Sequence, residues 1–133
     1  MARLRGDDAS LMKQPSLVIV EDDLLFAQAL TAFVEDLGYQ VVATAETEQA
    51  ACQLVLERDP DLVVMDINLA EGDGIGAALM IRESSQVPIV FCTSYAEDGA
   101  IKLAVKSMGK TALIGKPFDE AELANVLANS VRG

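Results

Sequence analysis

Residues 61–69 read Asp-Leu-Val-Val-Met-Asp-Ile-Asn-Leu, a stretch in which four consecutive apolar residues end abruptly at Asp66. A short, continuous apolar run of this kind is typical of a strand that is buried on both faces, as in a parallel sheet. Similar runs occupy residues 17–20, 89–92 and 112–114, and a weaker one covers residues 41–43. The sequence therefore predicts five short, largely buried strands.

Segments with helical periodicity lie between and after these runs. Apolar residues recur at spacings of three and four within residues 26–37, 50–55, 75–81, 101–108 and 123–127. Gly38 and Gly109 follow two of these segments, where glycine often ends a helix, and Asp119 is well placed to cap the start of the last one. Regular alternation of strand and helix predicts an α/β fold with an open, doubly wound, five-stranded parallel sheet.

The length of 133 residues leaves room for one domain. Residues 1–15 mix charges with Gly6 and Pro15 and show no periodicity, so we expect a flexible N-terminal tail. The regular pattern then covers residues 16–131, which we expect to form the domain. Because this pattern continues almost to Gly133, we expect no output domain.

The composition narrows the classes of function. Asp and Glu total 21 against 10 Lys and Arg, a net charge of -11 that disfavours direct binding of nucleic acid or of anionic membranes. The chain has no His, which excludes His catalysis and His metal ligation. It shows no apolar run long enough to span a membrane and no secretion signal. Cys52 and Cys92 are predicted to be buried, reduced thiols, which favours a cytoplasmic setting.

Polar residues follow the expected strands at one edge of the predicted sheet. In open α/β sheets, ligands bind beyond the carboxyl ends of the strands. Each of these residues has an ordinary explanation by itself, as a helix cap, a turn residue or a solvated lysine. Their joint occurrence at four strand ends favours a functional site. The residues are Glu21, Asp22 and Asp23 after the first strand, Asp66 and Asn68 after the third, Thr93 and Ser94 after the fourth, and Lys116 after the fifth.

Such a pocket suits phosphoryl transfer. Carboxylates from two strand ends would repel one another unless one is protonated or a cation is present, and an oxygen-rich pocket suits Mg²⁺. Asp66 would then be both a metal ligand and the nucleophile that forms an aspartyl phosphate. Lys116 and the Thr93 hydroxyl would contact other oxygens of the phosphoryl group.

The motifs resemble those of the receiver domain of bacterial response regulators across residues 16–131. One motif alone would be weak, but five in order with similar spacing are a specific signal. They are Val-Ile-Val-Glu-Asp-Asp (18–23), Asp-Leu-Val-Val-Met-Asp-Ile-Asn-Leu (61–69), Asp-Gly-Ile (73–75), Pro-Ile-Val-Phe-Cys-Thr-Ser (88–94) and Lys-Pro-Phe (116–118).

The resemblance implies a (βα)5 flavodoxin-like receiver fold with strand order 2-1-3-4-5, and a cis peptide bond before Pro117. It also implies a signalling module without enzymatic output. The phosphate donor would be a histidine kinase or a phosphotransfer protein, the target would be an unidentified protein, and the chain would be a monomer or a weak homodimer. The implied site has Glu21 and Asp22 as metal-binding residues, Asp66 as phosphoacceptor and metal ligand, the Asn68 backbone carbonyl as a further Mg²⁺ ligand, and Thr93 and Lys116 as phosphate-sensing residues.

Two positions depart from the family pattern. Ala70 stands where the family usually has proline, so we expect a somewhat freer loop after Asp66 with no loss of chemistry. Leu113 stands where many members have Tyr or Phe, and leucine cannot provide the inward movement of an aromatic ring that accompanies phosphorylation in those members.

Three alternatives remain in view. A Mg²⁺-dependent phosphohydrolase would also form an aspartyl phosphate, but it would need an acid or base at position 68, where this chain has Asn68. A flavodoxin-like flavin carrier would need a phosphate-binding loop after the first strand, where Glu21-Asp22-Asp23 would repel a flavin phosphate. A pseudo-receiver that never takes phosphate is disfavoured by the complete set of acidic, Thr and Lys residues.

Overall fold

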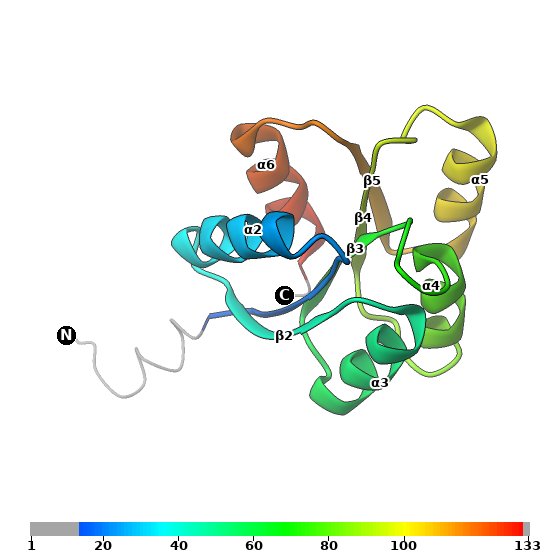
Figure 1. Ribbon diagram of the computed structural model, residues 1–133, viewed down its shortest axis with the longest axis horizontal. Coiled ribbons are helices and arrows are strands. Elements are labelled where there is room, and N and C mark those ends of the chain that lie inside the picture. The colour runs from blue at the N-terminus through cyan, green and yellow to red at the C-terminus, as the bar shows by residue number, and fades with distance from the viewer. Residues whose placement is uncertain (1–13, 132–133) are drawn as a thin grey trace.

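The computed structural model describes residues 14–131, and it contains five strands that alternate with five helices (Figure 1). Each expected strand and helix is present within a few residues of its predicted range. In chain order the elements are β1 (Ser16–Val20), α2 (Leu24–Asp36), β2 (Gln40–Ala45), α3 (Glu48–Arg58), β3 (Leu62–Asp66), α4 (Gly74–Arg82), β4 (Ile89–Thr93), α5 (Gly99–Met108), β5 (Thr111–Gly115) and α6 (Glu120–Ser130).

The five strands form one parallel sheet in the order β2-β1-β3-β4-β5, which confirms the predicted fold class and strand order. Every residue of β3 and β4 is buried, whereas most residues of the edge strands β2 and β5 are only half-buried. This difference explains why the apolar run of β2 is the weakest in the sequence, since an edge strand has a neighbour on one side only. β1 and β3 are direct neighbours, so their carboxyl ends lie side by side.

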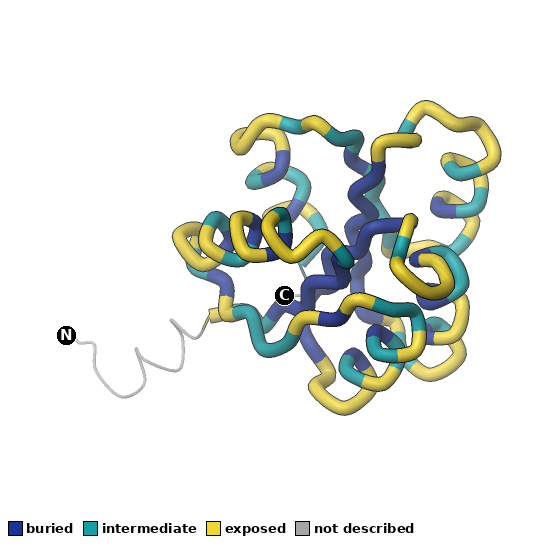
Figure 2. Tube along the Cα trace, viewed as in Figure 1, coloured by how far each residue is buried: buried dark blue, intermediate teal, exposed yellow. Residues whose placement is uncertain are grey.

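Helices cover both faces of the sheet, with α2 and α6 on one face and α3, α4 and α5 on the other (Figure 1). Two hydrophobic clusters fill the spaces between these layers and the sheet. Successive residues of β1 point to opposite faces, so Val18 and Val20 join the first cluster while Leu17 and Ile19 join the second. The central strands are the most deeply buried part of the chain (Figure 2).

All five helices begin with a side-chain cap. Asp23, Thr47, Asp73, Asp98 and Asp119 each accept a hydrogen bond from a backbone N–H in the first turn of the following helix. The predicted cap at Asp119 is confirmed. These caps fix where each helix starts, and each of the five starts follows the carboxyl end of one strand.

The two cysteines differ in burial. Cys92 is buried in β4, as predicted, but the prediction that Cys52 is buried is wrong, because Cys52 lies at the margin of α3 and is only partly covered. Its Sγ lies 3.6 Å from the Ala77 carbonyl oxygen of α4. Both thiols are free.

Thiol alkylation should separate the two cysteines. Burial raises the pKa of the Cys92 thiol to about 12, which leaves about one thiolate in ten thousand at pH 8. Burial also raises the pKa of Cys52, but this thiol is partly accessible. We expect iodoacetamide to modify Cys52 in the folded protein and Cys92 only after denaturation, as read by peptide mass spectrometry. Equal rates at the two sites in the folded protein would contradict this packing.

Within residues 14–131, none of the helices combines the length and the apolar character that crossing a membrane requires. The assignment of residues 1–15 as a flexible tail and of residues 16–131 as the domain remains a prediction, and residues 1–13 lie outside the described residues.

Candidate functional site

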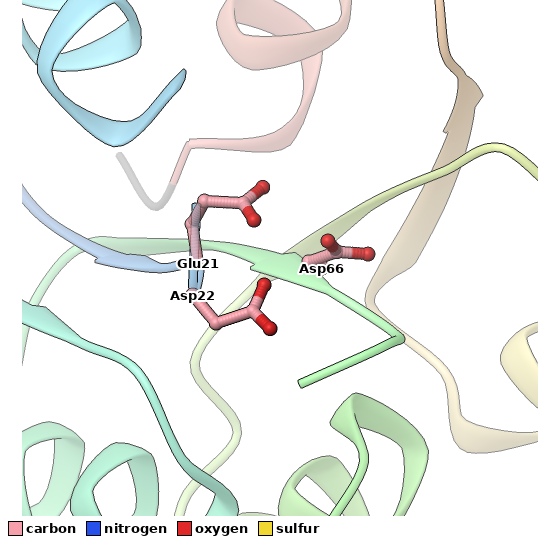
Figure 3. Close-up of side chains that lie close together, drawn as sticks. All are labelled: Glu21, Asp22 and Asp66. Atoms are coloured by element: carbon pink, nitrogen blue, oxygen red, sulfur yellow. The ribbon is translucent and has the colours of Figure 1, made fainter. Parts of the chain in front are cut away.

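Three carboxylates gather where β1 and β3 end (Figure 3). Glu21 and Asp22 directly follow β1, and Asp66 is the last residue of β3, so the pairing of these strands places the three side chains together. Carboxylate oxygens from the three residues lie within 4.8 Å of one another, which is a donor set that could hold a metal ion. Glu21 and Asp66 are buried and Asp22 is half-exposed, so the cluster is open to solvent on the Asp22 side.

Lys116 joins this cluster from the end of β5. Its Nζ donates to Glu21 Oε1 at 2.8 Å and to Asp66 Oδ2 at 3.2 Å. The same Nζ lies 4.2 Å from the centre of the Phe26 ring, which packs edge-to-face against Phe118. The ammonium is therefore held between two carboxylates and an aromatic face.

Carboxyl groups outnumber ammonium groups in this cluster by three to one. Burial raises the pKa of the Glu21 carboxyl, and the neighbouring Asp66 charge adds to this effect, although hydrogen bonds from Lys116 and the Asp23 amide oppose it. Burial would lower the pKa of the Lys116 ammonium, but its contacts with Glu21 and Asp66 outweigh burial and the pKa is raised. Lys116 therefore stays protonated at neutral pH, and this single ammonium faces two of the three carboxyl groups of the cluster.

The backbone around Asp66 is tightly constrained. Asp66 Oδ1 accepts a hydrogen bond from the Asn68 amide at 3.1 Å, and the Gly74 amide donates to the Ile67 carbonyl at 2.7 Å. Asn68 and Asp73 also form an isolated antiparallel bridge. A side chain at position 74 would lie far inside contact distance of the Asp66 carbonyl oxygen and 3.0 Å from Ile67 Cα. Gly74 thus allows α4 to start directly against the end of β3.

Gly74→Ala should destabilise the protein by about 1–3 kcal/mol or more, because the new methyl group meets backbone atoms that cannot move without displacing Asp66. The free energy of unfolding in urea measures this effect. Gly99→Ala is the matched control, since Gly99 starts α5 with open space around the position of a Cβ atom. We expect that control to have unchanged or slightly raised stability. Equal stability of the two variants would contradict the close approach at Gly74.

Thr93 ends β4 beside this cluster and is fully buried. Its carbonyl accepts a hydrogen bond from the Lys116 amide at 2.9 Å, which ties the ends of β4 and β5 together. Its Oγ1 accepts from the Tyr95 amide at 3.1 Å, so the hydroxyl proton remains available to another acceptor. Thr93 is not a helix cap, because Asp98 caps α5.

The structure thus joins the candidate Lys116 to Glu21 and Asp66 by hydrogen bonds and places Asp22 within 4.8 Å of these two carboxylates. The candidates Asn68 and Thr93 lie next to them in the chain or the sheet. Lys116 precedes Pro117 through a cis peptide bond, as the resemblance implied. Asp23 is the N-cap of α2, which was one of its two expected roles.

Sequence reasoning missed two contributors, Phe26 and Glu48. Phe26 was assigned only to a hydrophobic helix face, although its ring also covers Lys116. Glu48 starts α3 and contacts the loop after β3, because the Asp73 amide donates to its carboxylate at 3.0 Å. No local pattern signals either contact, since each joins residues that are distant in the chain.

Comparison with known proteins places this geometry in a family. The sequence model of the family described as "Response regulator receiver domain" matches residues 17–128 of this chain. The phyllosphere-induced regulator PhyR of Methylorubrum extorquens is 33% identical over 117 residues, which cover 86% of this chain and 43% of that protein. The transcriptional regulatory protein PdtaR of Mycobacterium tuberculosis is 32% identical over 116 residues, covering 87% of this chain and 56% of that protein. The chain therefore spans about half the length of these curated relatives.

A solved receiver-domain structure has the same fold as this chain. The solution structure of the receiver domain of PhyR from Erythrobacter litoralis superimposes with a TM-score of 0.78 at 31% identity, covering 90% of this chain and 92% of that one. By sequence and by fold, this chain belongs to the response regulator receiver domain family.

Proposed function

We propose that this chain is a phosphoacceptor signalling module that takes a phosphoryl group onto Asp66. The observation that carries the proposal is the arrangement around Asp66, where a buried carboxylate faces Lys116 at 3.2 Å and lies among two further carboxylates. Membership of the receiver family supports it. The groups needed for phosphoryl transfer are mainly positioned charges, and these strand ends supply them.

Mg²⁺ fits this donor set. The three carboxylates offer hard oxygen ligands within 4.8 Å of one another, and the half-exposed Asp22 leaves space for the water ligands that Mg²⁺ retains. A divalent cation would also pair with carboxyl groups that outnumber the single Lys116 ammonium. Glu21, Asp22 and Asp66 would hold the ion, with the backbone carbonyl of Asn68 as a further ligand. When bound, it would neutralise charge on the phosphoryl oxygens.

The protein's own residues would then carry the reaction. An Asp66 carboxylate oxygen attacks phosphorus and forms a new P–O bond, while the bond between phosphorus and the donor breaks and its electron pair leaves with the donor. Lys116 already lies against Asp66, so its ammonium is in position to pair with a phosphoryl oxygen. The buried Thr93 hydroxyl, whose proton is available, donates to another.

The donor would be a histidine kinase or a phosphotransfer protein, whose phosphohistidine loses its P–N bond in this step. We propose that the chain acts by protein–protein contact and without catalytic turnover of a substrate. Its strongly negative charge supports protein partners over direct contact with nucleic acid. Phosphorylation would shift an equilibrium between two conformations that partners distinguish. We further propose a cytoplasmic monomer or weak homodimer.

Intact-mass spectrometry with acetyl phosphate tests this proposal. We expect one phosphoryl adduct on the wild-type protein with Mg²⁺ and none after removal of the metal by a chelator. If the Mg²⁺-bound protein takes no adduct from acetyl phosphate or from a set of histidine kinases, the chain is a pseudo-receiver. Sustained release of phosphate from added phosphomonoesters would instead favour a phosphohydrolase and would contradict the proposal.

A further inference from the structure

The loop that connects β3 to α4, residues 67–73, carries the backbone of Asn68 beside Asp66. Its two ends are drawn together, because the Gly74 amide donates to the Ile67 carbonyl and Asn68 bridges to Asp73. The tip of the loop therefore projects from a narrow base. Proline does not stiffen this tip, since position 70 is alanine.

Glu48, the first residue of α3, holds this loop at two points, one near its tip and one at its base. Its backbone amide donates to the Glu71 carbonyl at 3.0 Å, and its side-chain Oε1 accepts from the Asp73 amide at 3.0 Å. The second bond joins residues 25 positions apart in the sequence. Both bonds lie on the side of the loop that faces α3.

The packing around Glu48 is as specific as its hydrogen bonds. A Cβ atom added at Gly72 would lie 2.5 Å from both Cβ and Oε1 of Glu48, and one added at Gly76 would lie 2.9 Å from Oε1. Gly72 also has a φ of +81°, a conformation that suits glycine. The two glycines thus leave the space that the Glu48 side chain fills.

Asp73 links Glu48 to the start of α4. Its amide is bound by Glu48, while its own Oδ1 caps α4 by accepting from the Gly76 amide at 2.7 Å. Glu48 therefore fixes one residue that both ends the loop and starts the next helix. A free loop would lose conformational entropy on ordering around a bound ion, and a loop that is already held loses less.

We propose that Glu48 is a positioning residue that holds the 67–73 loop in the conformation needed for Mg²⁺ binding and phosphorylation at Asp66. This inference rests on the proposed function for the identity of the ion and of the reaction. Glu48 acts through the backbone of the loop, by the reach of its carboxylate oxygen, and its negative charge is not what matters. The position of the loop, in turn, sets the position of Asn68.

Three variants of Glu48 distinguish the effect of its side-chain length from the effect of its negative charge. Glu48→Gln keeps the length and an oxygen acceptor but removes the charge. Glu48→Asp keeps the charge but is one methylene shorter, and Glu48→Ala lacks both. Gln49→Ala is a matched control, because Gln49 is exposed in the same first turn of α3. Thermal unfolding of all four proteins establishes that each is folded.

Amide hydrogen exchange in the Mg²⁺-free protein tests the hydrogen bond between the Asp73 amide and the Glu48 carboxylate directly. We expect the Asp73 amide to exchange at least about threefold faster in Glu48→Asp and Glu48→Ala than in wild type, because its acceptor is lost. Glu48→Gln and Gln49→Ala should match wild type. An unchanged Asp73 amide in both the Asp and Ala variants would overturn the proposal.

Mg²⁺ affinity, measured by calorimetry, reads the consequence. We expect the Kd to rise about tenfold in Glu48→Asp and Glu48→Ala, the scale of losses when a supporting residue around a metal site is removed. Glu48→Gln should stay within about twofold of wild type. A Gln variant as weak as the Ala variant would show that charge, not reach, is responsible, and would overturn the proposal.

Phosphorylation by acetyl phosphate should be slowed in the Asp and Ala variants at low Mg²⁺ and largely restored at saturating Mg²⁺. These results can be told apart from failure of the proposed function. If wild type takes no phosphate, the proposed function fails, but hydrogen exchange and Mg²⁺ affinity still decide the role of Glu48. If wild type is phosphorylated and the Asp and Ala variants behave identically to it at low Mg²⁺, only the role of Glu48 fails.

Discussion

Asp66→Asn is expected to abolish phosphorylation while leaving the fold intact. Asparagine has the same shape as aspartate, and its amide oxygen can still accept the Asn68 amide hydrogen bond that Asp66 makes at 3.1 Å. A neutral carboxamide, however, is not the carboxylate nucleophile that an aspartyl phosphate requires. With Mg²⁺ and acetyl phosphate, the variant should show no adduct by intact-mass spectrometry and an ordinary cooperative urea transition.

Asp98→Asn provides the control for this substitution. Asp98 caps α5 and accepts from the Ile101 amide at 3.0 Å, and asparagine is an equally good N-cap. The same chemical change at this exposed position should leave phosphorylation at the wild-type level. If the Asp66→Asn protein takes up as much phosphate as the wild-type protein, the assignment of Asp66 as phosphoacceptor is wrong.

The second large effect is expected in the double variant Glu21→Gln/Asp22→Asn. These two residues supply two of the three carboxylates within 4.8 Å of one another, so their neutralisation removes most of the negative charge that attracts a cation. Loss of supporting residues alone weakens metal binding roughly 10–100-fold, and loss of these two proposed metal-binding carboxylates should raise the Kd for Mg²⁺ by more than about 100-fold. Isothermal titration calorimetry measures this change.

A double variant elsewhere controls for overall charge. Glu97→Gln/Asp98→Asn removes two neighbouring acidic charges, and Glu97 is an exposed residue that pairs with Lys102 at 2.9 Å. Its Mg²⁺ affinity should remain close to that of wild type. If the two double variants bind Mg²⁺ equally well, the ion does not bind at the Glu21–Asp22–Asp66 cluster.

The sequence predicted the sheet and which candidate residues lie together, because each depends on short patterns. Buried parallel strands leave continuous apolar runs, and the residue after such a run must lie at the carboxyl edge of the sheet. Asp66 and Lys116 could be assigned to one edge in this way before their contact was seen. The sequence did not predict that Lys116 bridges Glu21 and Asp66, because the direction of a side chain does not follow from its position on an edge.

The contacts that sequence reasoning missed all depend on how helices lie across the sheet. The position of Phe26 over Lys116 requires α2 and the end of β5 to approach each other on one face. The hold of Glu48 on the loop requires α3 to start opposite Asp73. The partial exposure of Cys52 likewise depends on how closely α3 packs against α4. Helical periodicity gives the buried face of each helix but does not give these approaches.

The structure also bears on Ala70 and Leu113, the two positions that depart from the family pattern. The expected freedom of the loop around Ala70 is opposed by Glu48, which holds the neighbouring Glu71 and Asp73. Leu113 is half-buried in β5 and packs against the cluster on the α3, α4 and α5 face. The expectation that leucine at position 113 cannot provide the inward movement of an aromatic ring remains a prediction.

The central claim is that Mg²⁺ directs a phosphoryl group to Asp66, and mapping the modified residue tests it most directly. Hydride reduction converts an aspartyl phosphate to homoserine, which peptide mass spectrometry then locates in the chain. After treatment with acetyl phosphate and Mg²⁺, we expect homoserine at position 66 and nowhere else, and none when a chelator replaces Mg²⁺. Homoserine at another acidic residue, or an equal amount at position 66 without Mg²⁺, would contradict the account.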